Sequence, residues 1–148
     1  MEEEDKERYS MDTCIFCEII SKKEDAFIIY EDAYVCCFLD KYPINKGHIL
    51  VVPKDHYQEF REVDKESLTQ VILASQRIAT ALEELLNTDG ITIMQNNGIF
   101  KDVEHYHMHI IPRFLNDGFS WVEPENEVFN EEFISLSANL RETLNKSY

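Results

Sequence analysis

One long amphipathic segment interrupts a series of short apolar segments, and it constrains the fold of this 148-residue chain more than any other feature. Between residues 64 and 87, apolar side chains recur every three or four positions. This period predicts a helix with one buried face, and Asp64 is a suitable N-cap. The residues predicted to form the buried face are Leu68, Val71, Ile72, Ile78, Ala79, Leu82, Leu85 and Leu86.

Strand-sized apolar segments lie on both sides of this helix. Residues 27–30 and 34–39 predict a hairpin, and residues 49–52 predict a third strand that ends at Pro53. Residues 91–94 and roughly 107–112 bring the total to about five strands. Strands joined by short turns, with one long helix inserted, predict an antiparallel sheet with helices on one face, so the fold class is α+β. A C-terminal helix after Asn130 is predicted from the spacing of Phe129, Phe133, Leu136, Leu140 and Leu144.

The composition limits the domain count and the possible partners. A hydrophobic content of 44% in 148 residues suits one domain with a single core. Residues 1–12 are almost entirely polar and are expected to be a flexible acidic extension, whereas residues 123–148 are expected to be a helical extension. Fourteen basic against 29 acidic side chains give a net charge of -15, which disfavours binding to nucleic acid.

The sequence gives no signal for membrane insertion or secretion. Its longest apolar runs are only as long as a strand. Its first residues are acidic, whereas a signal peptide begins with basic residues that an apolar stretch follows. The four cysteines form a Cys-x-x-Cys and an adjacent pair, without the spread-out framework of a small secreted domain. We therefore expect a reducing, cytoplasmic location and no membrane partner.

The strongest functional signal is the run His105-Tyr106-His107-Met108-His109-Ile110-Ile111. In a strand, this alternation puts three imidazoles on one face and points Tyr106, Met108 and Ile110 into the core. Clustered histidines can also be plain metal ligands or an expression tag, but a tag would not alternate inside an apolar strand. Imidazoles about 7 Å apart must share a ligand or differ in protonation, because like charges disfavour each other.

The two cysteine pairs have different expected roles in the structure. Cys14 and Cys17 are compatible with a redox pair, with two buried thiols, or with half of a zinc site that takes two ligands from elsewhere. Cys36 and Cys37 lie within a predicted strand and are expected to be core residues.

The triad run resembles the signature of the histidine triad (HIT) family of nucleotide hydrolases and transferases. The similarity extends from Cys14 to about Trp121, and residues 47–56 are similar to the family's strand that leads into a Pro-Lys-x-His turn. The resemblance implies a HIT-like fold over residues 13–122. It also implies a homodimer in which the region around Trp121 approaches the other subunit.

The resemblance implies roles for the histidines. His107 would be the nucleophile that attacks the α-phosphorus and forms a nucleotidyl-imidazole, which water or another acceptor then resolves. A neutral imidazole attacks through its unprotonated nitrogen, so the other nitrogen must donate its proton to a fixed acceptor, which in the family is a backbone carbonyl. His109 would stabilise charge or protonate the leaving group. His48 would make a hydrogen bond that orients the triad, although an ordinary histidine at a strand end is an equal alternative.

The resemblance also implies a pocket for a purine nucleotide. Ile15, Phe16 and Phe38 would enclose the base, although from their residue types alone they would be core residues. Asp40 would accept hydrogen bonds from the ribose hydroxyls, because a carboxylate offers only acceptors. The substrate phosphate would be contacted by Asn96, through its amide, and by the backbone at Gly98, where a glycine allows close approach.

The loop before His105 and the Cys-x-x-Cys are two further features that the resemblance interprets. The loop before His105 is shorter than usual for the family, and Lys101 and Asp102 stand where a Gln-Ser pair commonly contacts the substrate. The sequence therefore does not determine which leaving group the protein prefers. The family members that carry this Cys-x-x-Cys imply a closed, structural zinc site. Catalysis would then need no added metal. Its ligands would be Cys14, Cys17, His56 and His105.

The predicted function is hydrolysis of nucleoside monophosphate derivatives at the α-phosphorus, either phosphoramidates or dinucleoside polyphosphates. The acidic composition favours phosphoramidates, which carry less negative charge. One alternative is a nucleotidyl transferase, but that branch typically has Gln at the third triad position, where this chain has His109. The other alternative is a zinc-stabilised nucleotide-binding or scaffold protein with little turnover.

Overall fold

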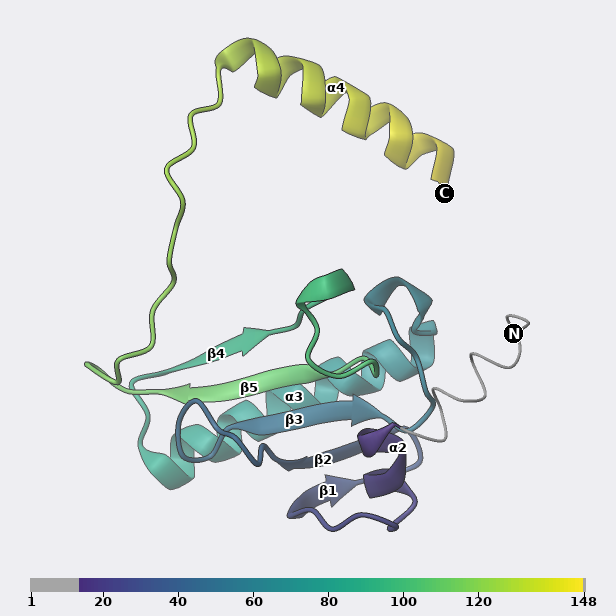
Figure 1. Ribbon diagram of the computed structural model, residues 1–148, viewed down its shortest axis with the longest axis vertical. Coiled ribbons are helices and arrows are strands. Elements are labelled where there is room, and N and C mark those ends of the chain that lie inside the picture. The colour runs from purple at the N-terminus through teal and green to yellow at the C-terminus, as the bar shows by residue number, and fades with distance from the viewer. Residues whose placement is uncertain (1–13, 148) are drawn as a thin grey trace.

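Five antiparallel strands form one sheet in the order β1-β2-β3-β5-β4, as the computed structural model shows for residues 14–147 (Figure 1). The predicted acidic extension over residues 1–12 lies outside these described residues. The α+β class and the five-stranded antiparallel sheet are confirmed. The elements are α2 (Ile15–Ile20), β1 (Ile28–Glu31), β2 (Val35–Leu39), β3 (Ile49–Pro53), η1 (Phe60–Glu62), α3 (Lys65–Leu86), β4 (Gly90–Met94), η2 (Gly98–Phe100), β5 (Met108–Arg113) and α4 (Asn130–Ser147).

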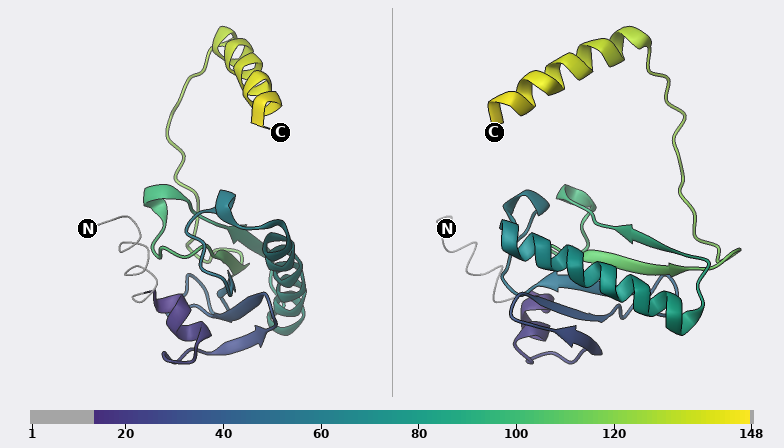
Figure 2. Two further views of the ribbon diagram at one scale, coloured as in Figure 1. Left: turned by 90° about the vertical axis from the view of Figure 1, so that its right-hand side faces the viewer. Right: turned by 180° about the vertical axis from the view of Figure 1, so that it is seen from behind.

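The central strands β2 and β3 are buried on both faces, because their side chains alternate between two packed layers. One set packs under α3 and consists of Val35, Cys37, Ile49 and Val51. The other set packs with α2 and consists of Cys36, Phe38, Leu50 and Val52. The expectation that Cys36 and Cys37 are core residues is therefore confirmed. The expectation that helices cover one face alone is wrong, since α2 lies on the face opposite α3 (Figure 2).

Helix α3 spans the predicted segment and begins as expected. The Asp64 carboxylate accepts a hydrogen bond from the backbone N–H of Ser67 at 2.6 Å, and the helix ends at Asn87 in the left-handed region (φ 52°). Two residues predicted to be buried are exposed, namely Ile72 and Leu85. Ile72 follows the fully buried Val71 and so lies about 100° around the helix from it, whereas Leu85 lies in the last turn.

Strand β5 begins at Met108, so only His109 of the triad lies in a paired strand, opposite Leu50 of β3 and Met94 of β4. The prediction of one strand carrying all three histidines is wrong for the first two. The chain before β5 leaves the sheet and bonds another segment, since Tyr106 N–H donates to the carbonyl of Tyr57 at 2.6 Å. The three imidazoles still share one side, because the residues that alternate with them pack in the core under α3, as predicted. These residues are Tyr106, Met108 and Ile110.

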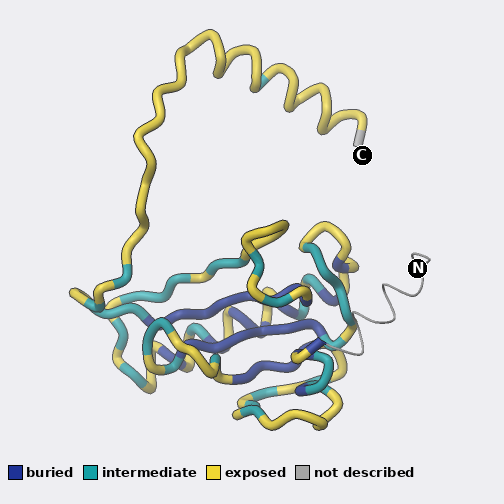
Figure 3. Tube along the Cα trace, in the orientation of Figure 1, coloured by how far each residue is buried: buried dark blue, intermediate teal, exposed yellow. Residues whose placement is uncertain are grey.

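Helix α4 forms where predicted but lies away from the sheet, at the end of an extended segment (Figures 1 and 3). Its apolar residues are more than half exposed, so no described residue buries this face. Among the residues described, no helix is both long and apolar enough to cross a membrane. The exposed apolar residues of the helix are Phe133, Ile134, Leu136, Leu140 and Leu144, and Phe129 directly before it is exposed as well.

Candidate functional site

Four predicted metal ligands meet beside the triad. The donor atoms of Cys14, Cys17, His56 and His105 all lie within 4.8 Å of one another. Nδ1 of His105 is 3.4 Å from Cys14 Sγ and 3.6 Å from Cys17 Sγ, and Nδ1 of His56 is 3.3 Å from Cys17 Sγ. A tetrahedral zinc ion with ordinary bond lengths separates sulfur and nitrogen ligands by about 3.6 Å. The donor set therefore fits a metal ion of this geometry.

The imidazole of His105 is held in the tautomer that a metal ligand needs. Its Nε2–H donates to the carbonyl oxygen of Pro53 at 2.8 Å, so Nδ1 carries the lone pair that faces the cysteines. Burial lowers the pKa of His105 to about 4, which keeps the ring neutral at pH 7. Burial also raises the pKa of the Cys17 thiol to about 12, so a metal that binds this thiolate must displace its proton.

His107 lies next to this cluster of candidate ligands, and only 5% of its surface is exposed. Its Nδ1–H donates to the backbone carbonyl oxygen of His105 at 2.6 Å, so in the neutral ring the lone pair lies on Nε2. The Phe16 ring packs edge-on against it, with centroids 5.1 Å apart. On the other side, Oδ1 of Asp102 is 3.1 Å from Nε2. A ring nitrogen and a carboxylate form a hydrogen bond only with a proton between them, so this contact must open before Nε2 can present a lone pair to a ligand.

A chain of hydrogen bonds fixes the tautomer of His109. The backbone N–H of Ile44 donates to Nδ1 of His48 at 3.0 Å, so His48 carries its proton on Nε2. That Nε2 is 2.9 Å from Nδ1 of His109 and 3.5 Å from a carboxylate oxygen of Asp40. His109 therefore accepts at Nδ1 and keeps its own proton on Nε2. Burial, together with the neighbouring imidazoles, lowers the pKa of His109 to about 4.

The predicted nucleoside contacts divide into buried and accessible groups. Phe16 and Phe38 pack edge to face with centroids 5.4 Å apart, and both are almost fully buried in the core, where Phe16 also contacts the rings of the triad. Ile15 is 39% exposed and remains open to a ligand. Asp40 accepts a hydrogen bond from the backbone N–H of Tyr42 through one oxygen, whereas its other oxygen faces His48.

The segment around Asn96 and Gly98 lies between β4 and the triad. Asn96 is exposed, and its neighbour Asn97 accepts the backbone N–H of Phe60 at 2.9 Å. Gly98 has φ +65°, and an added Cβ would meet no atom within 4 Å. The left-handed backbone by itself accounts for a glycine at this position. Its N–H donates to the Glu59 carboxylate at 3.2 Å, so a phosphate would have to compete with that bond.

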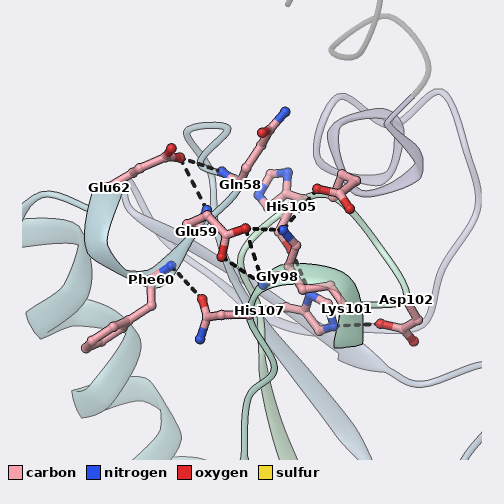
Figure 4. A network of polar contacts seen from close by, with 11 residues as sticks. Gln58, Glu59, Phe60, Glu62, Gly98, Lys101, Asp102, His105 and His107 are labelled. Atoms are coloured by element: carbon pink, nitrogen blue, oxygen red, sulfur yellow. Dashed lines mark hydrogen bonds and ion pairs between the residues drawn. The ribbon is translucent and has the colours of Figure 1, made fainter.

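An ion pair with a buried lysine lies in the loop before the triad and was not predicted from the sequence. The Lys101 ammonium lies 2.6 Å from Glu59 and 3.0 Å from Glu104, and its side chain is only 3% exposed (Figure 4). Glu59 and Lys101 are 42 residues apart, and neither lies in a periodic segment, so no local pattern could have paired them. This pair fixes the loop that precedes the triad.

Comparison with known proteins decides the family. The HIT domain family matches residues 21–116. The chain belongs to the HIT family. An uncharacterized HIT-like protein from Methanocaldococcus jannaschii is 45% identical over 107 residues, which cover 71% of this chain and 82% of that protein. The adenosine 5'-monophosphoramidase of Saccharomyces cerevisiae is 35% identical over 102 residues, which cover 68% of this chain and 62% of that enzyme.

Solved structures of HIT proteins share the fold. A HIT family protein from Bacillus anthracis has a TM-score of 0.81 at 34% identity, with 89% of this chain and 97% of that chain covered. A zinc-bound histidine triad family protein from Mycobacterium smegmatis has a TM-score of 0.70 at 34% identity, with 94% of this chain and 99% of that chain covered. The family resemblance and the fold class predicted from the sequence are thus confirmed.

Proposed function

We propose that this HIT protein is a nucleotide hydrolase that attacks the α-phosphorus of nucleoside monophosphate derivatives with Nε2 of His107. The observation that carries the proposal is the 2.6 Å hydrogen bond from Nδ1 of His107 to the carbonyl of His105, which assigns the attacking lone pair to Nε2. The yeast relative named as an adenosine 5'-monophosphoramidase supports this class of reaction.

The reaction proceeds in two displacements. A bond forms between Nε2 of His107 and phosphorus while the bond to the leaving group breaks, and the leaving group keeps that electron pair. Water then attacks the same phosphorus, and the nitrogen–phosphorus bond breaks to restore His107 and release the nucleoside monophosphate. When the leaving group is an amine, it takes up one proton, and the attacking water returns one to the solvent.

His109 and His48 serve the phosphoryl group in this scheme. Because His109 accepts from His48 at Nδ1, its Nε2–H is available to a phosphoryl oxygen that gains charge during attack. Burial lowers the pKa of His109 to about 4, which favours a neutral hydrogen-bond donor over a protonated acid. Asn96, which is exposed and follows Met94 of β4, the partner of His109, by two residues, supplies its side-chain amide to another phosphoryl oxygen.

The nucleoside lies against the α2 side of the triad. Ile15, Phe16 and Phe38 contact a purine base, and Asp40 accepts hydrogen bonds from the ribose, while the backbone at Gly98 lies by the phosphate. The net charge of -15 favours a phosphoramidate over a long polyphosphate. A substrate with few negative charges meets less repulsion from this surface.

The metal centre is structural in this proposal. Cys14, Cys17, His56 and His105 bind one zinc ion with no open ligand position, which ties α2 to the segment that carries the nucleophile. The donor chemistry, the spacing of the four atoms and the tautomer of His105 support zinc, as does the zinc-bound relative from Mycobacterium smegmatis. The metal holds the scaffold and takes no part in bond making.

A homodimer is the proposed assembly. Trp121 is 66% exposed, and the apolar residues of α4 are more than half exposed, which is unusual for a protein that functions as a monomer. A second copy of the chain could cover both surfaces.

A substrate panel tests the proposed function. We expect purified protein to convert adenosine 5'-phosphoramidate to AMP faster than it cleaves diadenosine tetraphosphate, and His107→Ala to abolish both activities. Nucleotide binding without turnover would instead support the scaffold alternative. Formation of a nucleotide sugar from a sugar phosphate would support the transferase.

A further inference from the structure

The carboxylate of Asp102 occupies the space in front of the proposed nucleophile. Its Oδ1 is 3.1 Å from Nε2 of His107, while Nδ1 of the same ring faces the carbonyl of His105. A phosphorus atom poised for attack sits about 3–3.5 Å from its nucleophile. A bound substrate therefore needs the position that the carboxylate now holds. The Asp102 side chain is 74% exposed, so it has room to turn aside.

The backbone of this loop is held in place, so Asp102 cannot move far from the reaction. Lys101, directly before it, is buried and lies 2.6 Å from Glu59. The Gly98 N–H donates to the same carboxylate at 3.2 Å, as Figure 4 shows. When a substrate enters, the aspartate side chain rotates about a fixed backbone. Its charge stays beside the phosphoryl group and the departing atom.

Lys101 does not offset this charge, although it directly precedes Asp102 in the loop. Its ammonium contacts both Glu59 and Glu104, at 2.6 and 3.0 Å, and its side chain is 3% exposed. One lysine with two carboxylates leaves a net negative charge. The loop therefore presents Asp102 to the substrate without a free counter-charge.

We propose that Asp102 is a specificity-determining residue that makes the enzyme favour cationic leaving groups over anionic ones. This inference rests on the proposed function and names the substrate class within it: nucleoside phosphoramidates of amines that carry a positive charge. A carboxylate beside the departing group stabilises an ammonium and repels a carboxylate or phosphate. The bonds that form and break are those of the proposed reaction, and Asp102 exchanges no atom with the substrate.

A series of leaving groups tests this directly. Three adenosine 5'-phosphoramidates share the same phosphorus–nitrogen bond and a similar chain length, and end in an ammonium, a hydroxyl or a carboxylate: those of propane-1,3-diamine, 3-aminopropanol and 3-aminopropanoate. At low ionic strength, kcat/KM of the wild type should fall in that order, with about a tenfold ratio between the ends of the series. Because Asp102 is largely exposed, added salt should reduce the ratio.

Two amide substitutions in the same loop separate Asp102 from the general acidity of the protein. Asp102→Asn keeps the shape and removes the charge, and should bring the ratio to within about twofold by raising kcat/KM for the anionic substrate most. Glu104→Gln removes the same charge from a residue that points to Lys101 and is 64% exposed. This control should keep most of the wild-type ratio.

The outcomes separate a failure of the Asp102 assignment from a failure of the proposed function. If the wild type hydrolyses the series but Asp102→Asn keeps the wild-type ratio, or Glu104→Gln changes it equally, Asp102 does not set the preference. If the wild type hydrolyses none of the three, the proposed function fails and this inference fails with it.

Discussion

His105 donates to Pro53 with its side chain, while its backbone carbonyl accepts the Nδ1–H of His107 at 2.6 Å. One residue thus connects the proposed metal centre and the proposed nucleophile. Its imidazole belongs to the cluster of four candidate ligands, and its carbonyl fixes the tautomer of the His107 ring. Any change that disorders His105 should reach His107, whereas a change in His107 need not reach the metal.

Substitution of the two neighbouring histidines should therefore have crossed effects. His105→Ala should reduce zinc well below one ion per chain and lower Tm by about 10 °C, because a ligand to a structural metal is lost. His107→Ala should keep the zinc and abolish turnover. Elemental analysis and thermal unfolding of both variants check this. Wild-type protein that carries no zinc after careful purification would contradict the assignment of the cluster.

Acid should destabilise the fold partly through His109. Its pKa is 6.5 in its unperturbed form and about 4 in the folded protein, so between these values only the unfolded chain binds the proton. Stability is thus retained above pH 6.5 and falls as the pH drops toward 4, with a loss of about 2 kcal/mol at pH 5. Urea unfolding at pH 7.5 and pH 5 should show a smaller loss for His109→Gln than for wild type. An equal loss in both proteins would contradict a buried neutral His109.

Asp40 should distinguish ribose from deoxyribose. Asp40→Ala should weaken binding of a ribonucleotide by about 1–3 kcal/mol, because hydrogen bonds to its hydroxyls are lost, and should affect the 2'-deoxy analogue less. Titration calorimetry with both nucleotides on the inactive His107→Ala background measures the difference without turnover. Equal loss for the two sugars would show that Asp40 acts through His48, which it faces at 3.5 Å.

The exposed stripe of α4 should be covered by a second copy of the chain. Leu136 and Leu140 are 56% and 52% exposed in the single chain. Replacing both by Glu should shift the protein from dimer to monomer in light scattering at micromolar concentration, since charge opposes burial of the stripe. Glu142→Gln, on the same helix, serves as a control that should leave the dimer intact. A monomeric wild type would rule out this assembly.

Periodicity and turn signals were sufficient for most of the fold. The helical period in residues 64–87 reflects a boundary between core and solvent, which a single sequence records directly. The alternation in residues 105–111 instead separates two buried faces, one with the imidazoles and one with the core residues. The short helix α2 was missed because six residues are too few to show a period. The expected burial of Ile72 and Leu85 was wrong because hydrophobicity alone does not fix how wide the covered face of a helix is.

The site was accessible to sequence reasoning only where motifs exist. The residues of the metal cluster and of the triad lie in recognisable spacings, and the structure brings them together. The Lys101–Glu59 pair and the contact of Asp102 with His107 depend on how a loop folds back over the sheet, and no local pattern encodes that. The position of His48 against His109 likewise requires the register of β3 and β5.

Trapping the covalent intermediate tests the central claim most directly. Wild-type protein mixed rapidly with a slowly hydrolysed adenosine phosphoramidate, and then denatured at alkaline pH, should carry one adenylyl group on His107, located by peptide mass spectrometry. His107→Ala should carry none, although it should bind the nucleotide and keep its zinc. An adenylyl group on His109, or substantial turnover by His107→Ala, would contradict the assignment of His107 as the nucleophile.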